Sequence, residues 1–360
     1  MPTPDLRTCL PMDARQLARF EGVYARYKRL WTDPDRAVPP IIIDIPTAGQ
    51  PTMEAQLADP LVMLRAQLET LKNHIAVEDD CVPTVRVSFG TAQVAAAFGC
   101  AFHFPPDSLP AAAGPVMTAA ADVHRLPRPA LDAAWFGKTA EWTRIWKQHL
   151  PAGVHIQHPD IQSAFNSAHL IRGNDILLDF YDSPAELDLL LDRVTDYMID
   201  LTRHLKAMIS DDREWFFDWL CLWKGTARIS NCTMQLISPQ QYREHVLPRA
   251  ARFFAAVGGG RMHYYGLTAD VIEDFFKVPG LHGLDIDCKV QDYFAICDRA
   301  PKHLVLFPTV GFAPGTREYK RLLAGDWPRK RNIVIMVKAK DVAEGRELLT
   351  TLRAVMPWRD

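Results

Sequence analysis

The stretch that decides the fold is SPQQYREHVLPRAARFFAAVGGGRMHYYG, at residues 238–266. Ser followed by Pro is a typical helix start, and three consecutive glycines end the predicted helix after residue 257. A short strand, predicted at 261–265, follows at once. A helix that leads directly into a buried strand is the repeating unit of an α/β protein.

The same alternation extends along the rest of the chain. Runs rich in apolar or β-branched residues predict strands, several of them buried on both faces, at 40–44, 84–89, 154–158, 216–223, 261–265, 281–287, 303–307 and 333–338. Amphipathic helices are expected between them, the longest at 185–208. This order predicts a (β/α)8 TIM barrel. An open doubly wound sheet is the alternative, but the glycine-rich turn of a dinucleotide site is missing after the first strand.

Two segments depart from a minimal barrel. We expect residues 1–38 to form an N-terminal helical extension and residues 39–360 to form the barrel. The connection at 100–150 is too long for a simple strand-to-helix loop, so it is predicted to elaborate the C-terminal face, where barrel active sites lie. Trp142 and Trp146 within it have helical spacing, which is typical of core packing.

Composition excludes several classes of protein. The chain of 360 residues has a formal net charge of −2 and is 48% hydrophobic, which argues against a nucleic-acid binder and against disorder. No apolar run is long enough to span a bilayer, and the N-terminal residues do not resemble a secretory signal. Seven cysteines without a CxxC pair predict a reduced, cytoplasmic protein.

Polar side chains at predicted strand ends are the candidate site residues. Strand alternation places His263 and Tyr265 on the same side of their strand, where they could exchange protons. The alternative is a hydrogen-bonded pair in the core. His158, Asp160 and Gln162 could form a polar wall that orients a substrate, although Asp160 could equally cap a loop.

Two further strand ends carry charge. Asp285 and Asp287 are two residues apart and could bind a metal or act as an acid–base pair, or Asp287 could cap a helix. Arg228 could bind a substrate carboxylate with its planar guanidinium, although surface charge is the commoner role. His263 and Cys288 could converge on a metal, but a third ligand has no obvious place.

Several ordered motifs resemble those of the uroporphyrinogen decarboxylase superfamily. The first resembles a GPF…lrG…DlydsPE segment, the second an SPe.y.efv.P helix, the third an H.cG strand end and the fourth an FGt…FG segment. In this sequence they are residues 162–184, 237–248, 261–266 and 85–99. The resemblance extends over about residues 40–350 and implies a (β/α)8 barrel.

The resemblance implies two chemistries. One is cofactor-free decarboxylation, in which arginines hold the carboxylates of uroporphyrinogen. The other is zinc-dependent methyl transfer involving a corrinoid or a thiol, with a His-X-Cys-Gly motif among the zinc ligands. This chain departs from both, because the Arg-rich segment after the first strand is missing and Tyr265 replaces the cysteine of the zinc motif. Lys338 also lies near the position where a second thiolate is expected.

The sequence therefore predicts a metal-independent lyase acting on a carboxylated or aromatic small molecule other than uroporphyrinogen. His263, Tyr265 and Asp160 are the expected catalytic residues, and Gln162, Arg228, Asp287 and His158 the expected substrate-binding residues. One alternative is a corrinoid-linked methyltransferase with altered zinc ligands and a corrinoid-protein partner. Another is a non-catalytic binding barrel. No cofactor, nucleic-acid partner or membrane partner is expected, and a homodimer stays open.

Overall fold

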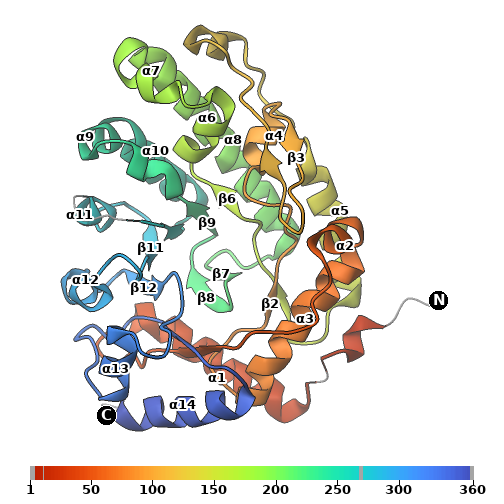
Figure 1. The fold of residues 1–360 in the computed structure, drawn as a ribbon, viewed down its shortest axis with the longest axis vertical. Helices are drawn as coiled ribbons and strands as arrows, with labels where there is room; N and C mark the ends of the chain where they lie inside the picture. Colours follow the sequence, from red (N-terminus) through yellow and green to blue (C-terminus); the bar gives the residue numbers. More distant parts are fainter. Residues whose placement is uncertain (1–4, 11, 267–270, 357–360) are drawn as a thin grey trace.

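The structure is a computed structural model that describes residues 5–10, 12–266 and 271–356. Parallel strands lie inside a surrounding set of helices (Figure 1). Along the chain the barrel strands are β1 (Ile41–Asp44), β2 (Thr84–Val85), β5 (His155–Ile156) with β6 (Ile161–Gln162), β9 (Ala227–Ser230), β10 (Gly260–His263), β11 (Leu281–Ile286), β12 (Val305–Pro308) and β13 (Ile335–Lys338). These strands occupy the eight positions of a (β/α)8 barrel.

Parallel ladders connect the strands in chain order. One sheet runs β6–β9–β10–β11–β12, while β2 pairs with β5 and β1 pairs with β13. A parallel bridge between Leu306 and Ile333 joins the β12 strand to the segment before β13. The pairing of the first barrel strand with the last is what a closed barrel requires.

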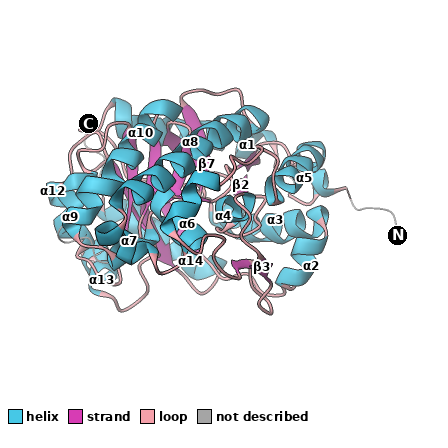
Figure 2. Cartoon of the chain, turned by 90° about the horizontal axis from the view of Figure 1, so that it is seen from above, coloured by secondary structure: helices cyan, strands magenta, loops and turns pink. Residues whose placement is uncertain are grey.

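Helices cover the outside of the strands (Figure 2). They are α1 (Ala14–Thr32), α2 (Met53–Ala58), α3 (Pro60–Val77), α4 (Gln93–Ala97), α5 (Trp135–His149), α6 (Ala164–Arg172), α7 (Ile176–Asp182), α8 (Pro184–Ile209), α9 (Pro239–Gln241), α10 (Leu247–Val257), α11 (Ile272–Phe275), α12 (Tyr293–Arg299), α13 (Arg317–Leu323) and α14 (Val342–Val355). Short 3₁₀ turns are η1 (Leu6–Thr8), η2 (Ala120–Arg125) and η3 (Cys232–Leu236), and a π-helical turn, η4 (Tyr242–Val246), joins α9 to α10. None of the helices within the described ranges is long and apolar enough to span a membrane.

The predicted helix starts are confirmed. Ser238 accepts a hydrogen bond from the backbone of Gln241 and forms a capping box, and Pro184 occupies the first turn of α8. The connection between β10 and β11 is also expected to be helical, from residue 268 to 277. Part of that range lies outside the described residues, and α11 begins at Ile272. The segment after β2 holds a small antiparallel pair, β3 (Phe102–His103) and β4 (Ala111–Ala112), before α5. Trp142 and Trp146 of α5 are buried, as expected for core packing.

One predicted barrel strand is wrong. Residues 216–223 do not form a single strand of the wall but an antiparallel hairpin of β7 (Trp215–Asp218) and β8 (Cys221–Lys224). The wall strand at this point is β9, which was not predicted. The hairpin lies in the middle of the ring of strands (Figure 1), where its side chains replace the usual layers of inward-facing strand residues.

The hairpin and α1 fill the inside of the barrel together. Tyr27 and Leu30 of α1 pack in one buried cluster with Trp223 of the hairpin and with Phe307 of β12. Trp31 of α1 donates its indole N–H to the carbonyl of His282, 2.9 Å away. The N-terminal helix thus supports the hairpin from below and holds its tip toward the C-terminal ends of the strands.

Candidate active site

His263 and Asp285 form a hydrogen-bonded pair at the ends of neighbouring strands. The parallel register of β10 and β11 pairs Met262 with Leu284, which points outward, so the residues that follow each of them face the lumen. The His263 Nδ1–H donates to Asp285 Oδ2 at 2.6 Å. Asp285 is fully buried, while the His263 side chain keeps 11% exposure. This geometry leaves Nε2 as the imidazole nitrogen available for chemistry.

Asp285 also holds an arginine. Arg261 lies on the same face of β10 and donates from Nε to Asp285 Oδ1 at 2.5 Å. Burial by itself raises the pKa of Asp285, but the charge of Arg261 and the hydrogen bonds from Arg261 and His263 outweigh burial and keep this pKa below its usual value. The carboxylate stays ionised and fixes both partners.

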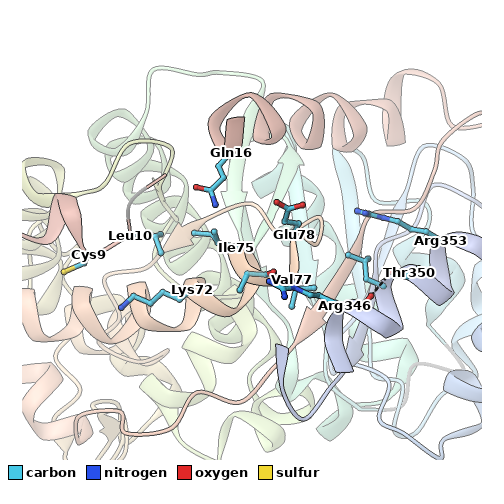
Figure 3. A pocket seen from close by; sticks show the side chains of 12 residues that line it. Cys9, Leu10, Gln16, Lys72, Ile75, Val77, Glu78, Arg346, Thr350 and Arg353 are labelled. Atoms are coloured by element: carbon cyan, nitrogen blue, oxygen red, sulfur yellow. Dashed lines mark hydrogen bonds between the residues drawn. The ribbon is translucent and has the colours of Figure 1, made fainter. Parts of the chain in front are cut away.

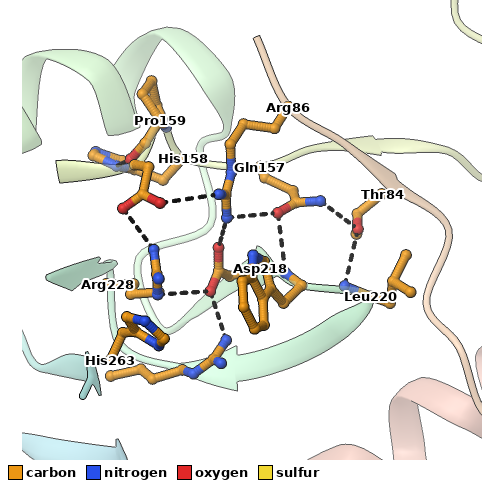
Figure 4. Close-up of polar contacts among 12 residues, drawn as sticks. Thr84, Arg86, Gln157, His158, Pro159, Asp218, Leu220, Arg228 and His263 are labelled. Atoms are coloured by element: carbon orange, nitrogen blue, oxygen red, sulfur yellow. Dashed lines mark hydrogen bonds and ion pairs between the residues drawn. The ribbon is translucent and has the colours of Figure 1, made fainter. Parts of the chain in front are cut away.

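Asp218 on the hairpin links three arginines of the wall. It accepts from Arg261 Nη1 at 2.6 Å, forms a short ion pair with Arg86, and lies 3.9 Å from Nε of Arg228. Figure 4 shows the guanidinium groups of Arg86 and Arg228 pointing at the Asp218 carboxylate. Gln157 accepts a further hydrogen bond from Arg86 at 3.0 Å.

Asp160 completes the charge network. Arg228 Nη1 donates to it at 2.6 Å, Ser230 Oγ at 3.2 Å and Arg86 Nη1 at 3.4 Å. Burial would raise the pKa of Asp160, but Arg228, Arg86 and His263 together lower this pKa to about 2. Asp160 is therefore a permanent anion, and Arg228 is already paired. The cluster of three arginines and three aspartates, Arg86, Arg228, Arg261, Asp160, Asp218 and Asp285, is balanced in formal charge.

Gln162 and Tyr265 lie near this cluster without joining it. Gln162 follows Ile161, which is buried against the outer helices, so the amide faces the lumen beside its register partner Ser230. Tyr265 follows the end of β10 and is 42% exposed. Neither side chain has a hydrogen bond to the charged cluster in the part of the chain that the structure describes.

His158 and Asp287 are placed elsewhere. The buried His158 ring donates from Nδ1 to the carbonyl of Pro159 at 2.9 Å, and burial lowers its pKa to about 4. Asp287 accepts hydrogen bonds from the backbone of Gly266 and Lys289, at 3.1 and 3.0 Å. Asp287 therefore braces two loops and does not cap the following helix, whose N-cap is Asp292. It is Asp285 rather than Asp287 that contacts His263.

The residues around His263 do not fit a thiolate-type zinc site. Tyr265 occupies the cysteine position, and Cys288 packs against the outer helices, where burial raises the pKa of its thiol. Among the described residues, the group of three potential ligands that converges is His74, Asp79 and Cys81, at the opposite end of the strands. There the Asp79 carboxylate already accepts from the backbone of Ile43 and from the His74 ring, both at 2.8 Å.

Sequence reasoning missed three members of the cluster as site residues: Arg86, Asp218 and Arg261. It named Asp285 only as one of a pair with Asp287. The three arginines of the cluster lie in or beside short apolar strands: Arg86 in TVRV, Arg228 in ARIS and Arg261 in GRMH. A single arginine on the inner face of a buried strand needs a buried carboxylate partner. That pattern is the signal that could have found the network.

A separate groove lies far from this cluster. It has a volume of about 840 Å³ and is lined by residues of α3, α14 and the N-terminal segment (Figure 3). Its charged side chains are engaged: Arg15 contacts Glu78 at 3.0 Å, Arg353 contacts Asp80 at 3.1 Å, and Arg346 donates to the carbonyl of Ala76 at 2.9 Å. The expected site residues do not line it, so we do not assign the active site there.

By its fold, the chain belongs to the large class of (β/α)8 barrels, whose functional sites lie at the C-terminal ends of the strands, where the His263–Asp285 pair lies. Within this class, the model of the family Uroporphyrinogen decarboxylase (URO-D) matches residues 58–300. This match extends over more than half of the chain, and the chain belongs to the uroporphyrinogen decarboxylase family.

The solved structures that resemble this one include a methyltransferase from Methanosarcina mazei. The two chains share 16% sequence identity and superpose with a TM-score of 0.67, covering 93% of this chain and 98% of that one. At this identity the likeness establishes the fold and no more. A search of curated proteins finds no match.

Proposed function

We propose that the chain is a lyase of the uroporphyrinogen decarboxylase family that removes CO2 from a small conjugated or aromatic acid other than uroporphyrinogen. The observation that carries the proposal is the 2.6 Å hydrogen bond between His263 and Asp285 at the C-terminal ends of the strands. A carboxylate behind Nδ1 fixes the tautomer and makes Nε2 a directed proton donor and acceptor.

The reaction needs one proton. As the bond between the carboxylate and its carbon breaks, CO2 leaves and the electron pair stays on that carbon. The imidazolium of His263 then delivers a proton from Nε2 to the carbon, and the imidazole is reprotonated from solvent. Asp285 stabilises the imidazolium, while Gln162 is placed to orient the substrate.

The charge balance of the cluster argues against uroporphyrinogen as the substrate. Each arginine of the cluster forms an ion pair with an aspartate: Arg86 with Asp218, Arg228 with Asp160 and Arg261 with Asp285. These arginines are therefore not free to bind a substrate with many carboxylates. Methyl transfer, the alternative expected from the sequence, stays compatible with this fold because a methyltransferase shares it. A non-catalytic barrel would bind ligands without turnover.

The test is a panel of aromatic and arylacetic acids, with uroporphyrinogen included, assayed for CO2 release. We expect CO2 release from at least one acid of the panel and no appreciable CO2 release from uroporphyrinogen. The acid that reacts is then assayed with Asp285→Asn, which we expect to lower kcat more than it raises KM. Binding of the panel without release of CO2, or methyl transfer to a thiol, would contradict the proposal.

A further inference from the structure

The turn of the internal hairpin has an unusual composition. Pairing of Asp218 with Cys221 leaves Trp219 and Leu220 as a two-residue turn, and their φ angles are +47° and +59°. Two left-handed residues in such a turn normally mean Asn-Gly or Asp-Gly, because a side chain is unfavourable there. A tryptophan held in this conformation is a strained position, and strain of this kind concentrates at functional sites.

The surrounding structure fixes the Trp219 backbone. Its backbone N–H donates to Gln157 Oε1 at 3.0 Å, and the next N–H, from Leu220, donates to Thr84 Oγ1 at 3.2 Å. The preceding residue is Asp218, the centre of the arginine network. Hydrogen bonds from the barrel wall therefore hold the turn in the left-handed region on both sides.

The indole ring lies beside the proposed proton donor. Its centroid is 5.6 Å from the ring of His263 and 6.1 Å from the ring of Phe307. The guanidinium groups of Arg228 and Arg261 lie 5.3 and 5.6 Å from it. Trp219 is only partly buried, in contrast to Trp223 of the same hairpin and to Phe307, which are fully buried.

The space below the indole is closed. Trp223 is fully buried there, and a Cβ on Gly283 would lie 2.4 Å from the Trp223 ring, so the two residues are in tight contact. The exposed part of the Trp219 ring must then face the C-terminal mouth. The nearby arginines are paired with aspartates, and the guanidinium groups of Arg228 and Arg261 lie over part of the indole. The surface offered to a ligand at this depth is therefore the exposed part of the indole and His263 Nε2.

We infer that Trp219 is the specificity-determining platform of the site, on which a planar aromatic acid stacks beside His263. The inference rests on the proposed function and adds the substrate's shape: a flat conjugated ring in place of a saturated acid of equal size. An aromatic face favours another aromatic group at centroid distances of about 4.5–7 Å.

The experiment compares benzoate with cyclohexanecarboxylate, which have the same charge and similar size but differ in planarity. Their Kd values are measured by ligand-detected NMR titration of the full chain. Trp219→Phe keeps an aromatic face, while Trp219→Asn removes it and suits the left-handed backbone. Leu220→Asn changes the other residue of the same turn and is the matched control.

We expect the native chain to bind benzoate about 5–10-fold more tightly than cyclohexanecarboxylate, the size of one aromatic contact. Trp219→Phe and Leu220→Asn should keep this preference, and Trp219→Asn should abolish it. If Trp219→Asn does not fold, Trp219→Gly replaces it. A preference that survives in the folded Asn or Gly variant, or a native chain without the preference, overturns the platform. Failure of the proposed lyase would show separately, as binding of the panel acids without any release of CO2.

Discussion

The hydrogen bond between His263 and Asp285 determines which imidazole nitrogen is free at the barrel mouth. The sequence placed His263 at a strand end, and that prediction holds in the structure. Its partner could not be assigned from sequence, because Asp285 and Asp287 have the same spacing pattern relative to a strand. Only the β10–β11 register puts Asp285 beside His263 and leaves Asp287 to bind backbone amides.

His263→Ala should lower kcat by about 10²–10⁴-fold, the usual contribution of a positioned proton donor. It should also lower the free energy of unfolding by about 1–3 kcal/mol, because Asp285 Oδ2 loses its partner in a buried site. Turnover and urea unfolding measure the two effects. His303→Ala, at an exposed histidine, is the matched control and should change neither. Full activity in His263→Ala would refute the proton-transfer role.

Asp160 should contribute to stability in a pH-dependent way. Its folded-state pKa is about 2, below the ordinary 3.8, so its stabilisation is complete above the unfolded-state pKa and is lost as pH falls toward the folded-state pKa. Asp160→Asn leaves Arg228 and Arg86 without this partner and should cost roughly 3–5 kcal/mol at neutral pH.

The check on Asp160 is a series of denaturant melts of native and Asp160→Asn protein at several pH values. The difference in unfolding free energy should be constant from about pH 7 to pH 5 and should shrink below about pH 4. A difference that grows as the pH falls would mean that Asp160 is not held as an anion by the two arginines.

At the scale of elements, the internal hairpin is the feature that sequence patterns misjudged. The pattern of residues 216–223 predicts one apolar strand, because the turn between β7 and β8 contains Trp219 and Leu220 in place of glycine or asparagine. The real wall strand β9 is short and carries Arg228, so its pattern is not that of a buried strand. Both errors arise from residues that break the local sequence rules for turns and buried strands.

Gly283→Ala should displace the hairpin. A Cβ at this position would lie 2.4 Å from Trp223, which is fully buried and cannot move away without cost. We expect a loss of roughly 1–3 kcal/mol from overpacking, together with weaker benzoate binding as Trp219 shifts. Gly22→Ala in α1 has open space around its Cβ and should stabilise by about 0.5–1 kcal/mol. Thermal melts of both variants would test the contact, and equal stability of the two would contradict it.

At the scale of the whole molecule, most of the barrel could be predicted because alternation of helix and strand is a local signal. Seven of the predicted strand segments overlap wall strands of the structure. The interior could not be predicted, since α1, the hairpin and three arginine-bearing strands meet there only through long-range contacts. The expected site residues divide accordingly: His263, Asp160, Arg228 and Gln162 lie on the inside, and His158 and Asp287 are structural.

The purified protein should contain clearly less than one zinc per chain. His263 donates its Nδ1–H to a carboxylate, and an exposed tyrosine occupies the cysteine position of the motif. Cys288 is partly buried and packs against the hydrophobic core outside the strands. Elemental analysis of protein purified without chelators measures the zinc content per chain. One tightly held zinc per chain that is lost in His263→Ala would favour the methyltransferase alternative.

The central claim is that His263 donates a proton to the carbon that loses CO2. Mass spectrometry of the product formed in D2O, from the acid that the panel identifies, tests it most directly. The account predicts one deuterium at the carbon that carried the carboxylate, formed at a rate that falls about 10²–10⁴-fold in His263→Ala. A product without deuterium at that carbon, or one formed equally fast without His263, would contradict it.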